Sequence, residues 1–109
     1  MIDSLAEFLL KVNGNEMAPT FQDGDIVLCV STDIIPDGGI AVIEAAGLAG
    51  SVTLKYCYRT PGGYVLDSEA CTQPPLFVAF DTIKPLGLPV LIERTSADGS
   101  MRILPVSAN

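Results

Sequence analysis

A mainly β fold is what this sequence predicts, and three observations predict it. Short apolar runs are separated by clusters of Gly, Pro, Asp and Ser, a spacing typical of strands joined by turns. Residues 52–58, VTLKYCY, alternate between two kinds of side chain with a period of two. The chain has 109 residues, of which 49% are hydrophobic, enough for one modest core. We therefore expect a single domain over residues 1–109.

Eight strands are expected in chain order, at residues 8–12, 26–30, 39–44, 51–58, 63–66, 76–80, 87–94 and 100–106. Residues 2–10 also fit one or two helical turns, because their leucine and phenylalanine side chains would share a helical face. The strand is the preferred interpretation there. The sequences Gly-Gly at 62–63 and Ala-Asp-Gly at 97–99 are typical of hairpin turns.

The alternating segment 52–58 has two different faces. Its bulky apolar side chains are on one face: Val52, Leu54, Tyr56 and Tyr58. The other face carries Thr53, Lys55 and Cys57. Lys55 therefore points away from the bulky apolar face, and a lysine on such a strand is ordinarily in solvent.

The charge distribution argues against direct binding of nucleic acid. The formal net charge is −7, and the six basic residues are scattered: Lys11, Lys55, Arg59, Lys84, Arg94 and Arg102. Holding a phosphate backbone relies on clustered Lys and Arg, so we expect DNA contact only through an N-terminal domain not in this chain. Acidic residues stand where a secretory signal has positive charge, and no apolar run approaches the roughly 18 residues of a membrane span. We expect a cytoplasmic protein without membrane contact.

The cysteines predict neither a disulfide framework nor a metal site. There are three, widely spaced, with no histidine and no CxxC pair. Cys29 and Cys57 fit small apolar strand residues, whereas Cys71, in a polar loop, leaves open a reactive thiol. The Asp-Gly-Asp at 23–25 lacks further calcium ligands and is interpreted as a turn entering a strand. We expect no cofactor and no metal.

Residues 12–28 read VNGNEMAPTFQDGDIVL. This order resembles the signature of the LexA, UmuD and phage-repressor peptidases: glycine, a short polar residue, serine, methionine, Pro-Thr, then Gly-Asp before a hydrophobic strand. The residues in register are Gly14, Met17, Pro19, Thr20, Asp23, Gly24, Asp25 and Val27. Segments 37–43, 52–56, 64–75 and 83–87 are also similar to that family, so the resemblance extends from about Phe8 to Glu93.

The resemblance implies a twisted, partly barrel-like β-fold and a specific chemistry. In that family a serine attacks an Ala-Gly bond in the protein's own hinge, with a neutral lysine as general base. Lysine in water titrates near ~10.4, so such a base needs a site that disfavours its charged form. Lys55 falls at the position of the family's lysine, and Glu16 falls at the position of its serine.

A carboxylate at position 16 removes the hydroxyl nucleophile and favours the charged form of Lys55. We predict an ion pair between Glu16 and Lys55. The alternative is that Glu16 extends into solvent and Lys55 is an ordinary strand residue. Thr20 and Ser51 are the hydroxyls considered as substitutes, but nothing in the sequence places either against Lys55. Ala-Gly pairs occur at 46–47 and 49–50, where a flexible turn is expected.

These observations favour a non-cleaving oligomerisation and regulatory domain of a phage or bacterial repressor. Two alternatives stay open: a self-cleaving Ser/Lys peptidase whose nucleophile is altered in this chain, and a stand-alone acidic protein-binding module. The expected partners are a second copy of the chain, in a dimer or larger assembly, and an antirepressor or inducer protein. The apolar hairpin at 87–106 is the candidate pairing surface, although it also fits the core.

Overall fold

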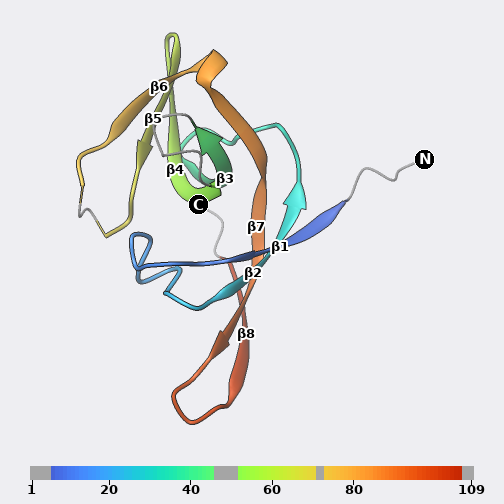
Figure 1. Cartoon of the computed structure of the whole chain (residues 1–109). Coiled ribbons are helices and arrows are strands. Elements are labelled where there is room, and N and C mark those ends of the chain that lie inside the picture. Colours follow the sequence, from blue (N-terminus) through green and yellow to red (C-terminus); the bar gives the residue numbers. More distant parts are fainter. Residues whose placement is uncertain (1–5, 46–51, 71–72, 107–109) are drawn as a thin grey trace.

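The computed structural model describes residues 6–45, 52–70 and 73–106 (Figure 1). Its elements in chain order are β1 (Glu7–Lys11), β2 (Ile26–Ser31), β3 (Gly39–Ala45), β4 (Val52–Thr60), β5 (Gly63–Asp67), β6 (Leu76–Ala79), the 3-10 turn η2 (Phe80–Thr82), β7 (Ile83–Thr95) and β8 (Met101–Pro105). The strands form one sheet in the order β1-β2-β7-β3-β4-β5-β6, and β8 pairs with β7. The predicted mainly β fold is confirmed. Across the described residues the sheet is not closed into a barrel.

Each predicted strand is present, and the differences lie at the ends. The largest concerns β7, which begins at Ile83 rather than at residue 87. Its first residues pair with β3, where Pro85 lies opposite Ile43 at a register shift that accommodates the missing N–H. The first hairpin turn occupies 61–62, and residue 63 already belongs to β5. The N-terminal strand is confirmed over Glu7–Lys11, while residues 1–5 lie outside the described part.

Strand β7 organises the sheet, because three other strands pair with it (Figure 1). It pairs with β2 along 87–93, with β3 along 83–87 and with β8 along 91–95. Pro89 also stands at a register shift, opposite Cys29. The two ends of β7 therefore belong to different parts of the sheet, and the β7–β8 hairpin projects beyond the rest of the molecule.

The core has a cluster on each face of the sheet. One contains Met17, Phe21, Val27, Cys29, Ile40, Val42, Leu54 and Ile92. The other contains Ile35, Ala41, Ile43, Ala45, Cys57, Tyr64, Leu66 and Val78. Strand β3 contributes to both, which explains its nearly uninterrupted apolar sequence. Cys29 and Cys57 are fully buried, as predicted, and burial raises the pKa of their thiols to about 11 and about 12. Cys71 lies outside the described residues.

Gly87 lies where β7 passes from β3 to β2, and it has no room for a side chain. A Cβ there would clash with the carbonyl oxygen of Val30 and lie 2.8 Å from the ring of Phe8. We expect Gly87→Ala to lower the free energy of unfolding by about 1–3 kcal/mol, because overpacking forces the strands apart. Urea denaturation followed by circular dichroism measures this. An unchanged midpoint would show that this crossing tolerates a methyl group.

The β7–β8 hairpin is not simply core, as one interpretation of the sequence had it. Val90, Met101 and Ile103 are 39%, 56% and 58% exposed, whereas Leu104 packs against the first core cluster. The hairpin thus carries apolar side chains on its outer surface. The one helical element of the described residues, η2, has three residues, and no helix there is long and apolar enough to cross a membrane.

Candidate functional site

The loop between β1 and β2 carries the motif residues, and its two ends are joined by backbone hydrogen bonds. The Val12 N–H donates to the Asp25 carbonyl at 2.8 Å, and the Gly24 N–H donates to the Val12 carbonyl at 2.9 Å. Gly24 has φ of 91°, a left-handed conformation that favours glycine. Met17 and Phe21 anchor the middle of the loop in the core, with 4% and 0% exposure.

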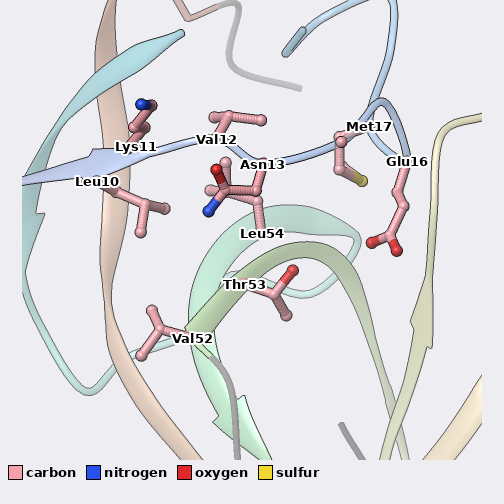
Figure 2. A pocket seen from close by; sticks show the side chains of 10 residues that line it. Leu10, Lys11, Val12, Asn13, Glu16, Met17, Val52, Thr53 and Leu54 are labelled. Atoms are coloured by element: carbon pink, nitrogen blue, oxygen red, sulfur yellow. The ribbon is translucent and has the colours of Figure 1, made fainter. Parts of the chain in front are cut away.

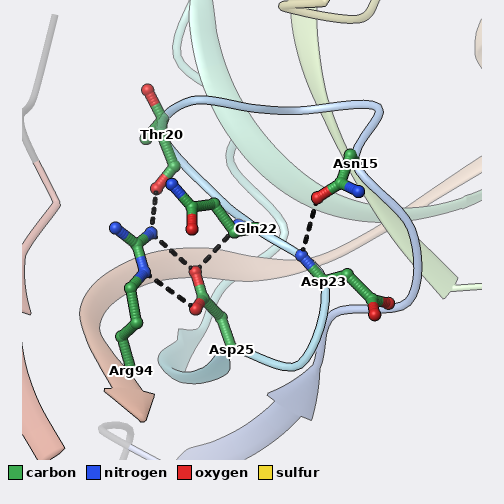
Figure 3. A network of polar contacts seen from close by, with 6 residues as sticks. All are labelled: Asn15, Thr20, Gln22, Asp23, Asp25 and Arg94. Atoms are coloured by element: carbon green, nitrogen blue, oxygen red, sulfur yellow. Dashed lines mark hydrogen bonds and ion pairs between the residues drawn. The ribbon is translucent and has the colours of Figure 1, made fainter. Parts of the chain in front are cut away.

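Polar contacts fix the outer part of the same loop. The Asp23 N–H donates to the side-chain oxygen of Asn15 at 3.0 Å (Figure 3). The Gly14 N–H donates to Asp23 Oδ1 at 2.7 Å, and Gly14 has φ of 92°. Because both ends and the middle of the loop are held, the backbone at Glu16 has a defined position. Pro19 follows a cis peptide bond and is exposed.

Asp25 does more than end a turn, which is all that its sequence context indicated. Its side chain is 2% exposed and accepts two hydrogen bonds from Arg94 of β7, at 3.0 and 2.8 Å (Figure 3). Arg94 also donates to the Thr20 carbonyl at 3.1 Å, and the Gln22 N–H donates to Asp25. Burial alone would raise the pKa of Asp25, but the hydrogen bonds from Arg94 and Gln22 and the positive charge lower it overall. This ion pair ties the loop to β7.

Lys55 of β4 is buried, with 9% of its side chain exposed, so the expectation of a solvated strand lysine is wrong. Its ammonium donates to Ser68 Oγ at 2.6 Å and lies 3.4 Å from Glu16 Oε1. The Glu16 side chain is 50% exposed. The predicted contact between Glu16 and Lys55 is present, with the lysine inside and the carboxylate at the surface.

Ser68 is the residue that the sequence reasoning missed. It is 7% exposed and follows β5 directly. The β4–β5 register pairs Thr60 with Gly63 and Tyr56 with Asp67, so one further step places Ser68 opposite Lys55. Counting outward from the observed turn at 61–62 gives this pairing, whereas the turn expected at 62–63 would have placed Ala70 opposite Lys55.

Two contacts join the segment after β5 to the loop that carries Glu16. The Ala70 N–H donates to the Glu16 carbonyl at 3.0 Å, and the Glu69 N–H lies 3.4 Å from the sulfur of Met17. One carboxylate oxygen of Glu69 is buried without a hydrogen-bond partner among the described residues. The polar site therefore forms where these two segments meet at Lys55, in the first half of β4.

A pocket of about 240 Å³ lies beside Glu16 (Figure 2). It lies between the start of β4 on one side and the end of β1 with the loop that follows it on the other. Its lining residues are Leu10, Lys11, Val12, Asn13, Gly14, Glu16, Met17, Val52, Thr53 and Leu54. The register leaves one edge of β4 unpaired here, because β5 pairs with β4 only from Tyr56 onward. The pocket is thus an open groove next to the Glu16 carboxylate.

The structure brings Lys55, Glu16 and Met17 into this site, whereas Gly14, Pro19, Thr20, Gly24 and Asp25 shape the loop around it. Within the described ranges no hydrogen bond joins Thr20 to Lys55, and Ser51 and the Ala-Gly pairs at 46–47 and 49–50 lie outside them. Within residues 6–45, 52–70 and 73–106, acids and cysteines form no group of three or more that could hold a metal ion.

Comparison with known proteins gives one family. No curated protein matches the chain. A family model described as Peptidase S24-like matches residues 2–90, which include the β1–β2 loop, Lys55 and Ser68. This match covers most of the sequence, and the chain therefore belongs to the Peptidase S24-like family.

Proposed function

We propose that this domain is a member of its family that does not cleave itself and that serves as the assembly and regulatory part of a cytoplasmic transcriptional repressor. DNA binding would belong to an N-terminal domain outside this chain. Release from DNA would then depend on another signal, such as an antirepressor or inducer protein.

One observation carries the proposal: the group 3.4 Å from Lys55 Nζ on the loop side is the carboxylate of Glu16. The resemblance noted above puts a serine hydroxyl at this position. A carboxylate at this position supplies no hydroxyl to act as a serine nucleophile beside Lys55.

Intact mass tests the absence of self-cleavage. We expect the native chain to keep its full mass over a day at about pH 7 and at about pH 10, because raising the pH supplies no nucleophile at position 16. Fragments that accumulate faster at the higher pH would overturn the proposal.

A specific contact supports a second candidate, a residual Ser/Lys peptidase that uses Ser68. Its Oγ lies 2.6 Å from Lys55 Nζ, a distance suited to proton transfer. Two features weigh against it: Ser68 is 7% exposed, and the residues that line the adjacent pocket do not include it. Fragments from the native chain that disappear in Ser68→Ala would favour this candidate.

The proposed assembly surface is the outer edge of β8. Met101 and Ile103 are both more than half exposed there, and among the described strands β8 pairs with β7 alone. An apolar edge strand of this kind invites pairing with another copy. We expect Ile103→Lys to weaken self-association by at least about 30-fold, the scale of an interface hot spot. Sedimentation velocity across a concentration series measures it. Leu9→Lys is the matched control, since Leu9 is 68% exposed on β1. A native chain that is monomeric throughout would contradict the assembly role.

A further inference from the structure

Lys55 has two partners of unequal strength. The Ser68 contact is 2.6 Å long and lies in the interior, whereas the Glu16 contact is 3.4 Å long and reaches a half-exposed carboxylate. Solvent weakens an ion pair of the second kind, and many such pairs contribute nothing measurable. A short, buried, charge-assisted hydrogen bond is the stronger interaction. Ser68, rather than Glu16, therefore dominates the position of the ammonium.

Ser68 is itself held on both sides. Before it, β5 pairs with β4 up to Asp67, and the Ser68 N–H donates to Asp67 Oδ1 at 2.9 Å. After it, the Ala70 N–H donates to the carbonyl of Glu16. The hydroxyl thus occupies a place fixed by the sheet and by the β1–β2 loop together, with no contribution from the Glu16 side chain.

We propose that Ser68 is the positioning residue for Lys55, holding its nitrogen toward position 16 whether or not a carboxylate is there. Oγ accepts one N–H of Lys55 and so fixes the rotation of the amino group. When the lysine is neutral, its lone pair is left free for a hydroxyl at position 16. The claim that Ser68 positions Lys55 is independent of the proposed function, whereas its catalytic consequence rests on that function.

The position that Ser68 gives to the Lys55 ammonium can be tested on the native chain by a measurement that needs no enzymatic activity. Lys55 is the one buried lysine; Lys11 and Lys84 are exposed. In a proton–nitrogen correlation spectrum of the side-chain ammonium groups, near neutral pH and at low temperature, we expect one slowly exchanging signal. It should persist in Glu16→Gln, vanish in Ser68→Ala and be largely restored in Ser68→Thr, which keeps the hydroxyl.

Thr60→Ala is the matched control, because it removes another partly buried hydroxyl, the one that donates to the Gly63 carbonyl. It should leave the protected signal in place. A signal that survives Ser68→Ala but is lost in Glu16→Gln would overturn the proposal. If Ser68→Ala does not fold, Glu16→Gln still tests the proposal, because loss of the protected signal in that variant would overturn it.

A second readout tests the catalytic consequence in the Glu16→Ser background. Adding Ser68→Ala should lower the rate of self-cleavage about 100-fold, the cost of misplacing a reacting group by about 1 Å. Ser68→Thr should retain most of the rate and the same pH profile. Equal rates for all three chains would overturn the positioning role. If Glu16→Ser itself does not cleave, that result counts against the proposed function. The ammonium signal then remains the test of whether Ser68 positions Lys55.

Discussion

Replacing Asp25 with alanine is expected to lower the free energy of unfolding by about 3 kcal/mol, or roughly 10 to 20 °C in Tm. The substitution leaves Arg94 beside the core without its partner and removes the acceptor for the Gln22 N–H. Loss of one member of a buried pair costs about 3–5 kcal/mol. We expect the lower end, because the Arg94 side chain keeps 18% exposure and can turn toward water.

Differential scanning calorimetry measures the effect, with Asp98→Ala as the matched control. Asp98 is exposed and its carboxylate bonds only Ser100, in the turn between β7 and β8. That control should leave Tm nearly unchanged. Equal Tm values for Asp25→Ala and the native chain would mean that the loop is held without the ion pair.

The same carboxylate makes the stability of the native chain depend on pH. The folded state lowers the pKa of Asp25, so in acid it binds protons less readily than the unfolded chain, whose aspartates titrate near ~3.9. Its stabilising contribution is therefore complete above about pH 4 and is lost as the pH falls through the folded pKa. The difference in stability between the native chain and Asp25→Asn should shrink over that range. A difference that stays constant down to about pH 2 would contradict this linkage.

Exchanging Glu16 for serine should have the largest effect on activity: if the proposed function is right, the Glu16→Ser chain should cleave an Ala-Gly peptide bond that the native chain leaves intact. The introduced hydroxyl would pass its proton to neutral Lys55 as its oxygen bonds to the alanine carbonyl carbon. The C–N bond then breaks, the glycine amine leaves with the proton that Lys55 took up, and water releases the alanine carboxyl group from the serine. Positioned general-base catalysis contributes about 100-fold to 10,000-fold in rate. Because a lysine accepts a proton only when it is neutral, the rate should rise with pH.

The assay follows the intact mass of the chain over a day, together with the mass of an added peptide that contains an Ala-Gly bond. Glu16→Ala provides the matched control, since it removes the carboxylate without supplying a hydroxyl. Glu16→Ser combined with Lys55→Met should also be inactive. Cleavage by Glu16→Ala would mean that relieving the charge is sufficient and that another residue is the nucleophile.

The strand pattern could be predicted because it depends on local signals. Glycine, proline and aspartate end the strands, and the burial of β3 on both faces follows from its apolar sequence. The expected strand began at residue 87, so the start of β7 at Ile83 was missed; residues 83–85 pair with β3, which lies about 40 residues earlier in the chain. Pro85 lies at a register shift in that pairing.

The residues of the candidate site likewise divide into those that local sequence patterns could predict and those that depend on contacts between distant segments. The register of one hairpin places Ser68 opposite Lys55, but the turn expected at 62–63 would have placed Ala70 there, so a shift of one residue in the turn hid this neighbour. The burial of Lys55 was not predictable from alternation, because it involves contacts with Glu16 and Ser68, which lie 39 and 13 residues away in the sequence. Asp25 and Arg94 lie 69 residues apart, and no local pattern pairs them. The contact between Glu16 and Lys55 was expected from a family resemblance and not from spacing.

Reaction with a fluorophosphonate, followed by intact mass, tests most directly whether Glu16 is the one residue that prevents a reactive serine nucleophile at the Lys55 site. The native chain, Glu16→Ser, and Glu16→Ser with Lys55→Met would be incubated side by side at about pH 8. We predict no adduct on the native chain, one adduct at position 16 of Glu16→Ser, and none once Lys55 is removed. An adduct on Ser68 of the native chain, or a folded Glu16→Ser chain that stays unmodified, would contradict the account.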